Sequence, residues 1–395
     1  MPTPTYKVDP ALYQFATVRQ LEILEAIDKH KGQRPAAKAL GATYGTVRDA
    51  YRSVLKKAAL QGYSPAHDLT RPVAPGQMLR GASTLYRRGE AEPVLQWVRT
   101  KADDVARQEM MQAAVDAMSE EIVPARPVPA PTVKASDDLC NLVVFSDYHI
   151  GMLAWHREGG SNWNLKIAEQ LLVDSFAHMV GSAPSAKHCV LCFQGDQQHF
   201  DGFAPVTNLH RNVLDADGRL SKIVGVTIRV IRSLVESALA KHESVHLIIC
   251  EGNHDEVSSL WLRHMFTALY ENEPRITVND SELPFYTHQH GDVMLAFHHG
   301  HKVKNEQLPM LFAAQFPQVW GATTKRYCHT GHRHHVDEKE YSGMTVTQHP
   351  TLAARDAYAA RGGWIAERSA VAVTYHKKFG QVSRTIVCPE MFETA

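Results

Sequence analysis

The chain has 395 residues, more than one hydrophobic core usually organises, so its length predicts two or three domains. Apolar residues make up 44% of the sequence and charged residues 21%, which is typical of a soluble globular protein. The formal net charge is zero, so any affinity for nucleic acid must come from local patches. No apolar stretch reaches the ~18 residues of a membrane-spanning helix, and the N-terminus lacks the pattern of a signal peptide. We therefore expect a cytoplasmic protein without a membrane partner.

Three helices are predicted near the N-terminus. Apolar spacing and capping signals place them at residues 18–29, 34–40 and, capped by Thr43, up to about residue 59. Ala37, Gly41 and Val47 have the spacing of a helix-turn-helix, which needs a small residue at the helix crossing, glycine in the turn and an apolar anchor. The sequence therefore predicts an all-α helix-turn-helix domain over residues 1–66.

Positive charge gathers on this helical segment. Residues 31–57 contain seven basic residues against one acid, Asp49. Such a local excess is the electrostatic footprint of contact with a phosphate backbone, and the start of the third helix is where a helix-turn-helix reads bases. The residues expected to contact DNA are Tyr44, Thr46, Arg48, Arg52 and Lys56. An ordinary three-helix bundle with a solvated basic face, or one that contacts protein, remains the alternative.

Residues 67–121 are expected to form a hairpin and a connecting helix. The strands are predicted near residues 78–86 and 94–98, joined across Arg88-Gly89, and the hairpin would suit a wing on the DNA-binding unit. Four prolines follow within a few residues: Pro124, Pro127, Pro129 and Pro131. They predict a stiff, extended linker over residues 122–137, ahead of a last domain over residues 138–395.

Beyond the linker, strand-like and helical patterns alternate, which is the rhythm of an α/β domain. Four apolar runs that read as buried strands end in polar motifs, and a fifth polar cluster follows them. These motifs are Asp147-Tyr148-His149, Gly195-Asp196, Gly252-Asn253-His254-Asp255, His298-His299-Gly300 and Gly331-His332-Arg333-His334-His335. An open sheet presents such residues together at its carboxyl edge. Their carboxylates, imidazoles and carboxamide are ligands that hold divalent metals.

The ordered set DYH, GD, GNHD, HHG and GHRH resembles the motifs of the calcineurin-like metallophosphoesterases, over residues 139–388. The resemblance implies an α/β fold: a four-layered sandwich of two packed mixed β-sheets flanked by helices, with metals at one edge. The segment from Arg34 to Pro65, with GASTLYRRG and QWVRT after it, is similar to the leader of bacteriophage proteins that join a helix-turn-helix to such a phosphoesterase. A bacterial or phage-infected host cell is the setting that this likeness implies.

The resemblance also implies two divalent metal ions, with manganese expected and iron or zinc equally suited to the ligands. Asp147, His149, Asp196 and His334 would hold the first ion, and Asp196, Asn253, His299 and His332 the second, with Asp196 shared. His299 is preferred over His298 and His301 because it directly precedes the glycine of its motif. His254 would protonate the leaving oxygen, and Asp255 would orient His254.

The surroundings of the motifs favour a nuclease. Phosphoprotein phosphatases of this superfamily have Asp-Arg-Gly after the second motif and end the third with glutamate. Here Gly195-Asp196 leads into Gln197-Gln198, and the third motif ends in Asp255. His199 and Asp201, which come next, are read as an ordinary polar loop, with a place on the substrate face as the alternative. The form FSDYHIG and the GNHD ending are more similar to the nuclease and phosphodiesterase branches.

Joined to a DNA-binding head, this pattern indicates a two-metal-dependent phosphodiesterase that cuts DNA by metal-activated hydroxide. A small-molecule or nucleotide phosphoesterase whose N-terminal domain mediates protein contacts stays open. A non-catalytic DNA-binding protein also stays open, although the complete ligand set argues against it. The sequence leaves the oligomeric state undecided, and a homo-oligomer is compatible with it.

Overall fold

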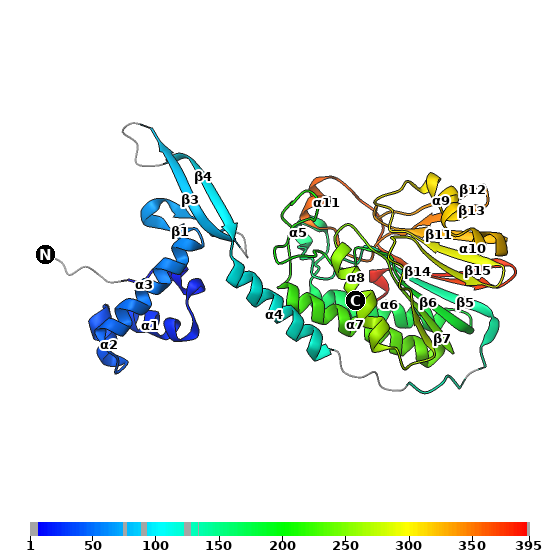
Figure 1. Cartoon of the computed structure of the whole chain (residues 1–395), viewed down its shortest axis with the longest axis horizontal. Coiled ribbons are helices and arrows are strands. Elements are labelled where there is room, and N and C mark those ends of the chain that lie inside the picture. The colour runs from blue at the N-terminus through cyan, green and yellow to red at the C-terminus, as the bar shows by residue number, and fades with distance from the viewer. Residues whose placement is uncertain (1–6, 74–76, 88–92, 122–127, 133, 393–395) are drawn as a thin grey trace. The chain divides into compact units, whose positions relative to one another are not determined.

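The computed structural model describes residues 7–73, 77–87, 93–121, 128–132 and 134–392 (Figure 1). The chain divides into two compact units, Met1–Glu109 and Met110–Ala395, and the division falls inside helix α4 (Asp104–Glu121). Of the linker expected over residues 122–137, residues 122–127 and 133 lie outside the described ranges. The domain boundary at this linker therefore stays a prediction.

The N-terminal unit contains the three expected helices, α1 (Val18–Lys29), α2 (Gln33–Ala39) and α3 (Tyr44–Leu60), after a 3-10 turn, η1 (Pro10–Phe15). Thr43 caps α3, because its side chain accepts a hydrogen bond from the backbone N of Thr46 at 3.1 Å. The helices bury a common apolar core that includes Leu24, Ile27 and Val47. The three helices predicted from the sequence are confirmed.

The same unit holds two small antiparallel sheets. One pairs β1 (Tyr63–Ser64) with β2 (Leu69–Thr70), and the other pairs β3 (Gln77–Tyr86) with β4 (Pro93–Ala102). The long hairpin agrees with the expected strands, while the predicted connection at Arg88-Gly89 lies outside the described residues.

The C-terminal unit is built on two mixed sheets (Figure 1). The first has the order β15-β14-β5-β6-β7-β8, and the second the order β12-β13-β11-β10-β9. The first comprises β5 (Ser136–Phe145), β6 (Ala186–Phe193), β7 (Ser244–Ile249), β8 (Ile276–Val278), β14 (Ala370–His376) and β15 (Gly380–Val387). The second comprises β9 (Tyr286–His290), β10 (Val293–Phe297), β11 (Lys325–Thr330), β12 (Asp337–Tyr341) and β13 (Met344–Gln348). Strands β5 to β8 run parallel to one another, and so do β10, β11 and β13.

Alternating side chains along the strands build two separate cores. Leu142 and Val144 of β5 pack against Leu295 of β10, which places the two sheets face to face. Val143 and Phe145, on the opposite face of β5, belong to the core that the sheet shares with its outer helices. These outer helices are α6 (Leu165–Ser182), α7 (Leu220–Lys241) and α8 (Glu256–Leu269).

The second sheet is covered on its outer face in the same way, by α9 (Leu308–Gln315) and α10 (Pro317–Ala322). The layers are therefore helix, sheet, sheet and helix, which confirms the predicted four-layered sandwich. Two short helices, α5 (His156–Gly159) and α11 (Ala357–Arg361), lie in the loops beyond the strand ends. Within the described ranges, none of the helices combines the length and apolarity needed to cross a bilayer.

Candidate metal centre

The five polar motifs meet at one edge of the sandwich. Strands β5, β6 and β7 are parallel neighbours, so their carboxyl ends lie together, and β10 and β11 do the same in the second sheet. Hydrogen bonds through Gln194 join the two edges. Its backbone oxygen accepts from Nδ1 of His299 at 2.8 Å, and its side-chain amide donates to the backbone oxygen of His329 at 3.0 Å.

One group of ligand atoms consists of Asp147, His149 and His334, which lie within 4.8 Å of one another. Oδ1 of Asp147 is 3.2 Å from Nε2 of His334. Two ligands that each lie ~2.1 Å from one cation are separated by roughly 3.0–3.4 Å at ordinary coordination angles. The spacing of this pair therefore fits a shared cation.

A second group consists of Asp196, His299 and His332, again within 4.8 Å of one another. Nε2 of His299 lies 3.2 Å from Oδ2 of Asp196 and 3.3 Å from Oδ1 of Asn253. The same nitrogen is 3.8 Å from Oδ1 of Asp147, so the two groups adjoin. All seven predicted metal ligands are thus brought together, and a bridging role for Asp196 stays a prediction.

His298 and His301 do not replace His299 in these groups. His298 stacks on Phe285 with ring centroids 5.0 Å apart, and its Nδ1 accepts a hydrogen bond from the backbone N of Gly300. The preference for His299, drawn from its place before glycine, agrees with this geometry.

The backbone of the ligand loops is unusual. Positive φ angles, which side chains other than glycine rarely adopt, occur at five predicted ligands: Asp147, His149, Asp196, His332 and His334. Each such residue costs about 1–3 kcal/mol and persists only where surrounding contacts impose it. Among the described residues only three others apart from glycine share this conformation: Lys31, Asp68 and Arg211. Strain is therefore concentrated on the loops that carry the predicted metal ligands, as is common at functional sites.

Two motif glycines permit the close approach of these loops. A Cβ at Gly252 would lie 2.2 Å from both the backbone N and Oδ1 of Asp196. A Cβ at Gly331 would lie 2.6 Å from Oδ2 of Asp147. No side chain fits at either position without displacing a carboxylate that belongs to the ligand groups.

Burial and charge set the protonation of the site. Burial alone would lower the pKa of His299, but the carboxylates of Asp196 and Asp147 outweigh it and raise the pKa to about 10. Burial lowers the pKa of His149 well below its usual value, and neighbouring His254 lowers it further. His149 is thus neutral and ready to coordinate, whereas His299 must release a proton when a metal binds.

His254 lies next to the ligands, with its ring centroid 4.9 Å from that of His149. Its backbone N donates to Oδ1 of Asp196 at 2.8 Å, and its Nδ1 donates to the backbone oxygen of His199 at 2.8 Å. The expected orienting partner, Asp255, does not perform that task. Its buried carboxylate instead accepts hydrogen bonds from four backbone amides, those of Asp196, Gln197, Gln198 and Gly252. Asp255 therefore holds two ligand loops together.

Two loop residues contribute more than the sequence pattern indicated. The ring of His199 stacks on His254 with centroids 5.8 Å apart, in addition to the contact through its carbonyl. Asp201 accepts from the backbone N of Val257 and Ser258, at 2.6 and 2.9 Å, and so caps the N-terminus of α8. For both residues, the only signal in the sequence is a polar side chain shortly after the Gly195-Asp196 motif. That signal does not identify the groups that the side chain contacts.

The residues expected to contact DNA lie on α3 in the N-terminal unit. Tyr44, Thr46, Arg52 and Lys56 are exposed, whereas Arg48 is half-buried and its Nε donates to Oδ1 of Asp49 at 2.9 Å. Asp49 offsets the positive charge of Arg48 in this ion pair. Arg52 and Lys56 are therefore the better placed of the expected residues to contact a phosphate backbone.

No protein-family model matches the chain, and no curated protein matches it either. Among solved structures, Vps29 of Entamoeba histolytica with bound zinc is 12% identical, at a TM-score of 0.29, over 62% of this chain and 98% of that one. An archaeal phosphodiesterase is 13% identical, with the same coverages and TM-score.

A predicted phosphoesterase from Streptococcus pneumoniae is 12% identical, at a TM-score of 0.24, over 60% of this chain and 83% of that one. Similarities at this level of identity and TM-score say nothing about the activity of this chain. What the chain can do follows from its own motifs and from the convergence of their side chains.

Proposed function

We propose that this chain, whose fold and motif order are those of the calcineurin-like metallophosphoesterases, is a metal-dependent phosphodiesterase that hydrolyses DNA. The observation that carries the proposal is the pair of adjoining ligand groups at the strand ends, with His254 beside them. The site supports hydrolysis of phosphoric esters in general, and DNA is the specific substrate that we propose. Manganese is the proposed metal, and iron or zinc would suit the same carboxylate, imidazole and carboxamide ligands.

Asp147, His149 and His334 would hold one cation, and Asn253, His299 and His332 a second, with Asp196 proposed as the ligand that the two share. Bound divalent cations would supply Lewis-acid activation of a phosphoryl group. A hydrogen bond on the far side of the ring orients His299. Its Nδ1 donates to the backbone oxygen of Gln194, which directs Nε2 toward the carboxylate of Asp196.

His254 is the proposed general acid. Because its Nδ1 donates to a carbonyl oxygen, that nitrogen keeps its proton, and Nε2 is left to meet the substrate. The residue is only half-buried, so its ring can reach both a bound phosphate ester and solvent. Protonation of the leaving oxygen by Nε2 would complete the cleavage, and solvent would then restore the proton.

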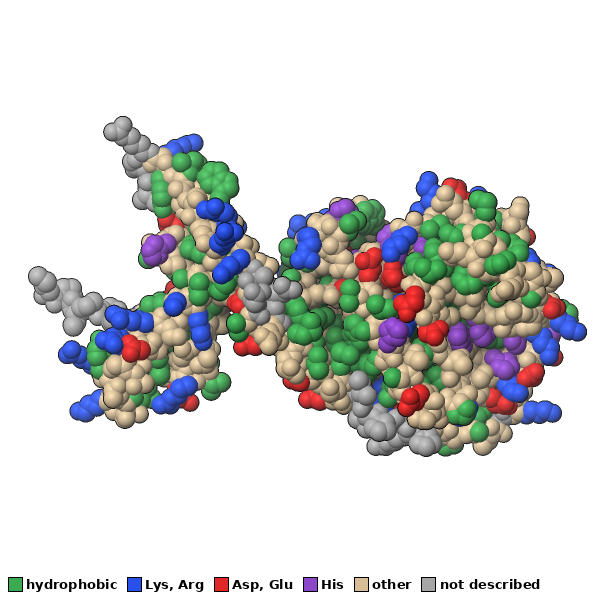
Figure 2. All heavy atoms as spheres, viewed as in Figure 1, with side chains coloured by type: hydrophobic (Ala, Val, Ile, Leu, Met, Phe, Trp, Pro, Cys, Tyr) green, Lys and Arg blue, Asp and Glu red, His purple; other side chains and the backbone are tan. Residues whose placement is uncertain are grey.

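The N-terminal unit is proposed to bring the site to DNA. Figure 2 shows Lys and Arg side chains spread over this unit, in a chain whose net charge is zero. Gly41, with a φ of 62°, makes the tight turn between α2 and α3, and Val47 lies fully buried on the inner face of α3. These features suit a helix-turn-helix whose exposed Tyr44, Thr46 and Arg52 face the major groove.

The β3–β4 hairpin supports the same proposal as a wing. Its described strands carry Arg80, Arg99 and Lys101 and contain no acidic residue. A ribbon with this composition is attracted to a phosphate backbone without needing to read bases.

The test is an assay of the full-length protein with manganese on linear and circular DNA, both single- and double-stranded, beside bis(p-nitrophenyl) phosphate. The Asp196→Asn variant controls for contaminating nucleases. DNA cleavage that the variant loses would support the proposal. Turnover of the chromogenic ester with every DNA left intact would refute DNA as substrate and move the activity to small phosphoesters.

A further inference from the structure

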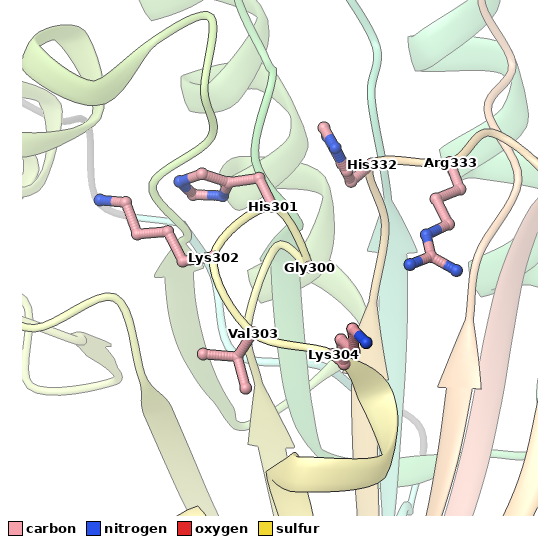
Figure 3. Close-up of a pocket in the computed structure, with 7 residues that line it drawn as sticks. All are labelled: Gly300, His301, Lys302, Val303, Lys304, His332 and Arg333. Carbon is pink, nitrogen blue, oxygen red and sulfur yellow. The ribbon is translucent and has the colours of Figure 1, made fainter.

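A pocket of about 190 Å³ adjoins the metal centre (Figure 3). It is lined by the loop Gly300–Lys304, which follows the ligand His299, and by His332 and Arg333. Its volume is many times the ~10–15 Å³ that one water molecule needs, so a small anion fits. His332 belongs both to the pocket and to the second ligand group, so an occupant of the pocket would lie beside that group.

Three cations line this pocket, but one of them is already neutralised. Nζ of Lys302 lies 2.5 Å from Oε1 of Glu251 and 3.4 Å from Oε1 of Glu256. Within the described part of the chain, no ion pair involves Lys304 or Arg333, and both side chains are exposed. Their positive charge is therefore available to a ligand.

The pocket wall also carries an unsatisfied polar group. The His301 side chain is only 8% exposed, and its Nε2 lies 4.0 Å from Oε1 of Glu256. Neither ring nitrogen has a hydrogen-bond partner among the described residues. Figure 3 shows its ring beside Lys302, on the Gly300–Lys304 loop. A buried polar group without a partner is costly, and a ligand or its hydration shell is the usual remedy.

We infer that this pocket binds a second phosphate of the substrate, next to the phosphate held at the metal centre, through Lys304 and Arg333. The inference deepens the proposed phosphodiesterase function and rests on it. A substrate with a single phosphate leaves the pocket empty, whereas a nucleic-acid strand presents a flanking phosphate at every internal linkage. The pocket thus favours polynucleotides over mononucleotides and over simple phosphodiesters.

The test compares the binding of two nucleotides to the manganese-loaded full-length protein by titration calorimetry. Thymidine 5′-monophosphate carries one phosphate, and thymidine 3′,5′-bisphosphate carries two at the spacing of a DNA strand. We expect wild-type protein to bind the bisphosphate about tenfold more tightly, a factor that equals ~1.4 kcal/mol. Lys304→Ala and Arg333→Ala should each reduce this preference, and Lys304→Glu should abolish it.

Lys378→Ala is the matched control. Lys378 is an exposed lysine in the turn between β14 and β15, at the sheet edge opposite the metal centre, since β14 runs antiparallel to β5. This variant should keep the full preference for the bisphosphate. Manganese content is measured for every variant, because Arg333 stands between two predicted ligands.

Equal affinity of wild-type protein for the two nucleotides would overturn the inference, and so would an unchanged preference in Lys304→Ala and Lys304→Glu. Neither result would touch the proposed function, which fails separately if no phosphodiester is hydrolysed. The two failures are therefore distinguishable.

Discussion

Replacing Asp255 with asparagine tests whether this carboxylate is a clamp between ligand loops. Oδ1 accepts from the backbone N of Asp196 and Gly252, at 3.2 and 3.0 Å, and Oδ2 from Gln197 and Gln198, at 2.6 and 3.2 Å. An asparagine keeps one acceptor oxygen and turns an N–H group toward the other pair. Whichever way the amide faces, two buried backbone donors lose their partner.

Each buried donor left without a partner costs about 1–3 kcal/mol, so the free energy of unfolding should fall by roughly 2–6 kcal/mol. Urea denaturation of the metal-free full-length protein, followed by tryptophan fluorescence, measures this change. Asp292→Asn is the matched control, because that carboxylate is exposed in the turn between β9 and β10. It should leave the free energy of unfolding within ~0.5 kcal/mol of wild type.

The alternative role for Asp255, orientation of His254, makes the opposite prediction. Turnover would fall while the free energy of unfolding stayed at the wild-type value. That result would refute the clamp, because a side chain that accepts from four buried amides cannot be altered without a loss of stability.

Three further predictions concern the site and the head. His254→Ala should retain the metal content of wild type while phosphodiester turnover drops by about 10²–10⁴-fold, measured by elemental analysis and a chromogenic assay; loss of metal instead would make His254 a ligand. Gly252→Ala should lower both metal content and stability, since its Cβ would stand 2.2 Å from Asp196; circular dichroism melting curves that match wild type would contradict that contact. Arg52→Ala with Lys56→Ala should weaken DNA binding and flatten its salt dependence by about two phosphate contacts, and an unchanged slope in fluorescence anisotropy would remove α3 from the interface.

Much of the fold could be predicted because local pattern and final environment agree. The β5 segment is buried on both faces, and its continuous apolar run ending in Phe145 reads as such a strand. Thr43 caps α3 as expected, because threonine directly before a helical pattern is a preferred N-cap residue whose side chain accepts from a free backbone amide of the first turn. The ligand cluster could be anticipated for a similar reason: polar residues that directly follow parallel strands must meet at one sheet edge.

What escaped prediction depends on contacts between segments distant in the chain. Asp255 follows His254 in sequence, yet three of its four backbone partners lie on the loop after β6, 57 to 59 residues earlier. The carbonyl of His199, which orients His254, carries no sequence signal, because every residue has a carbonyl. The pocket of Lys304 and Arg333 unites loops from β10 and β11, and only the parallel pairing of those strands brings them together.

If the two adjoining ligand groups form one two-metal centre, the metal stoichiometry of the protein is the most direct evidence for it. Metal-free protein would be reloaded with manganese, freed of excess metal, and examined by elemental analysis and by electron paramagnetic resonance. The proposed two-metal centre predicts two manganese ions per chain with magnetic coupling between them, and, if Asp196 is the shared ligand, loss of both ions in Asp196→Asn. A single uncoupled ion in wild-type protein, or two ions retained in Asp196→Asn, would contradict it.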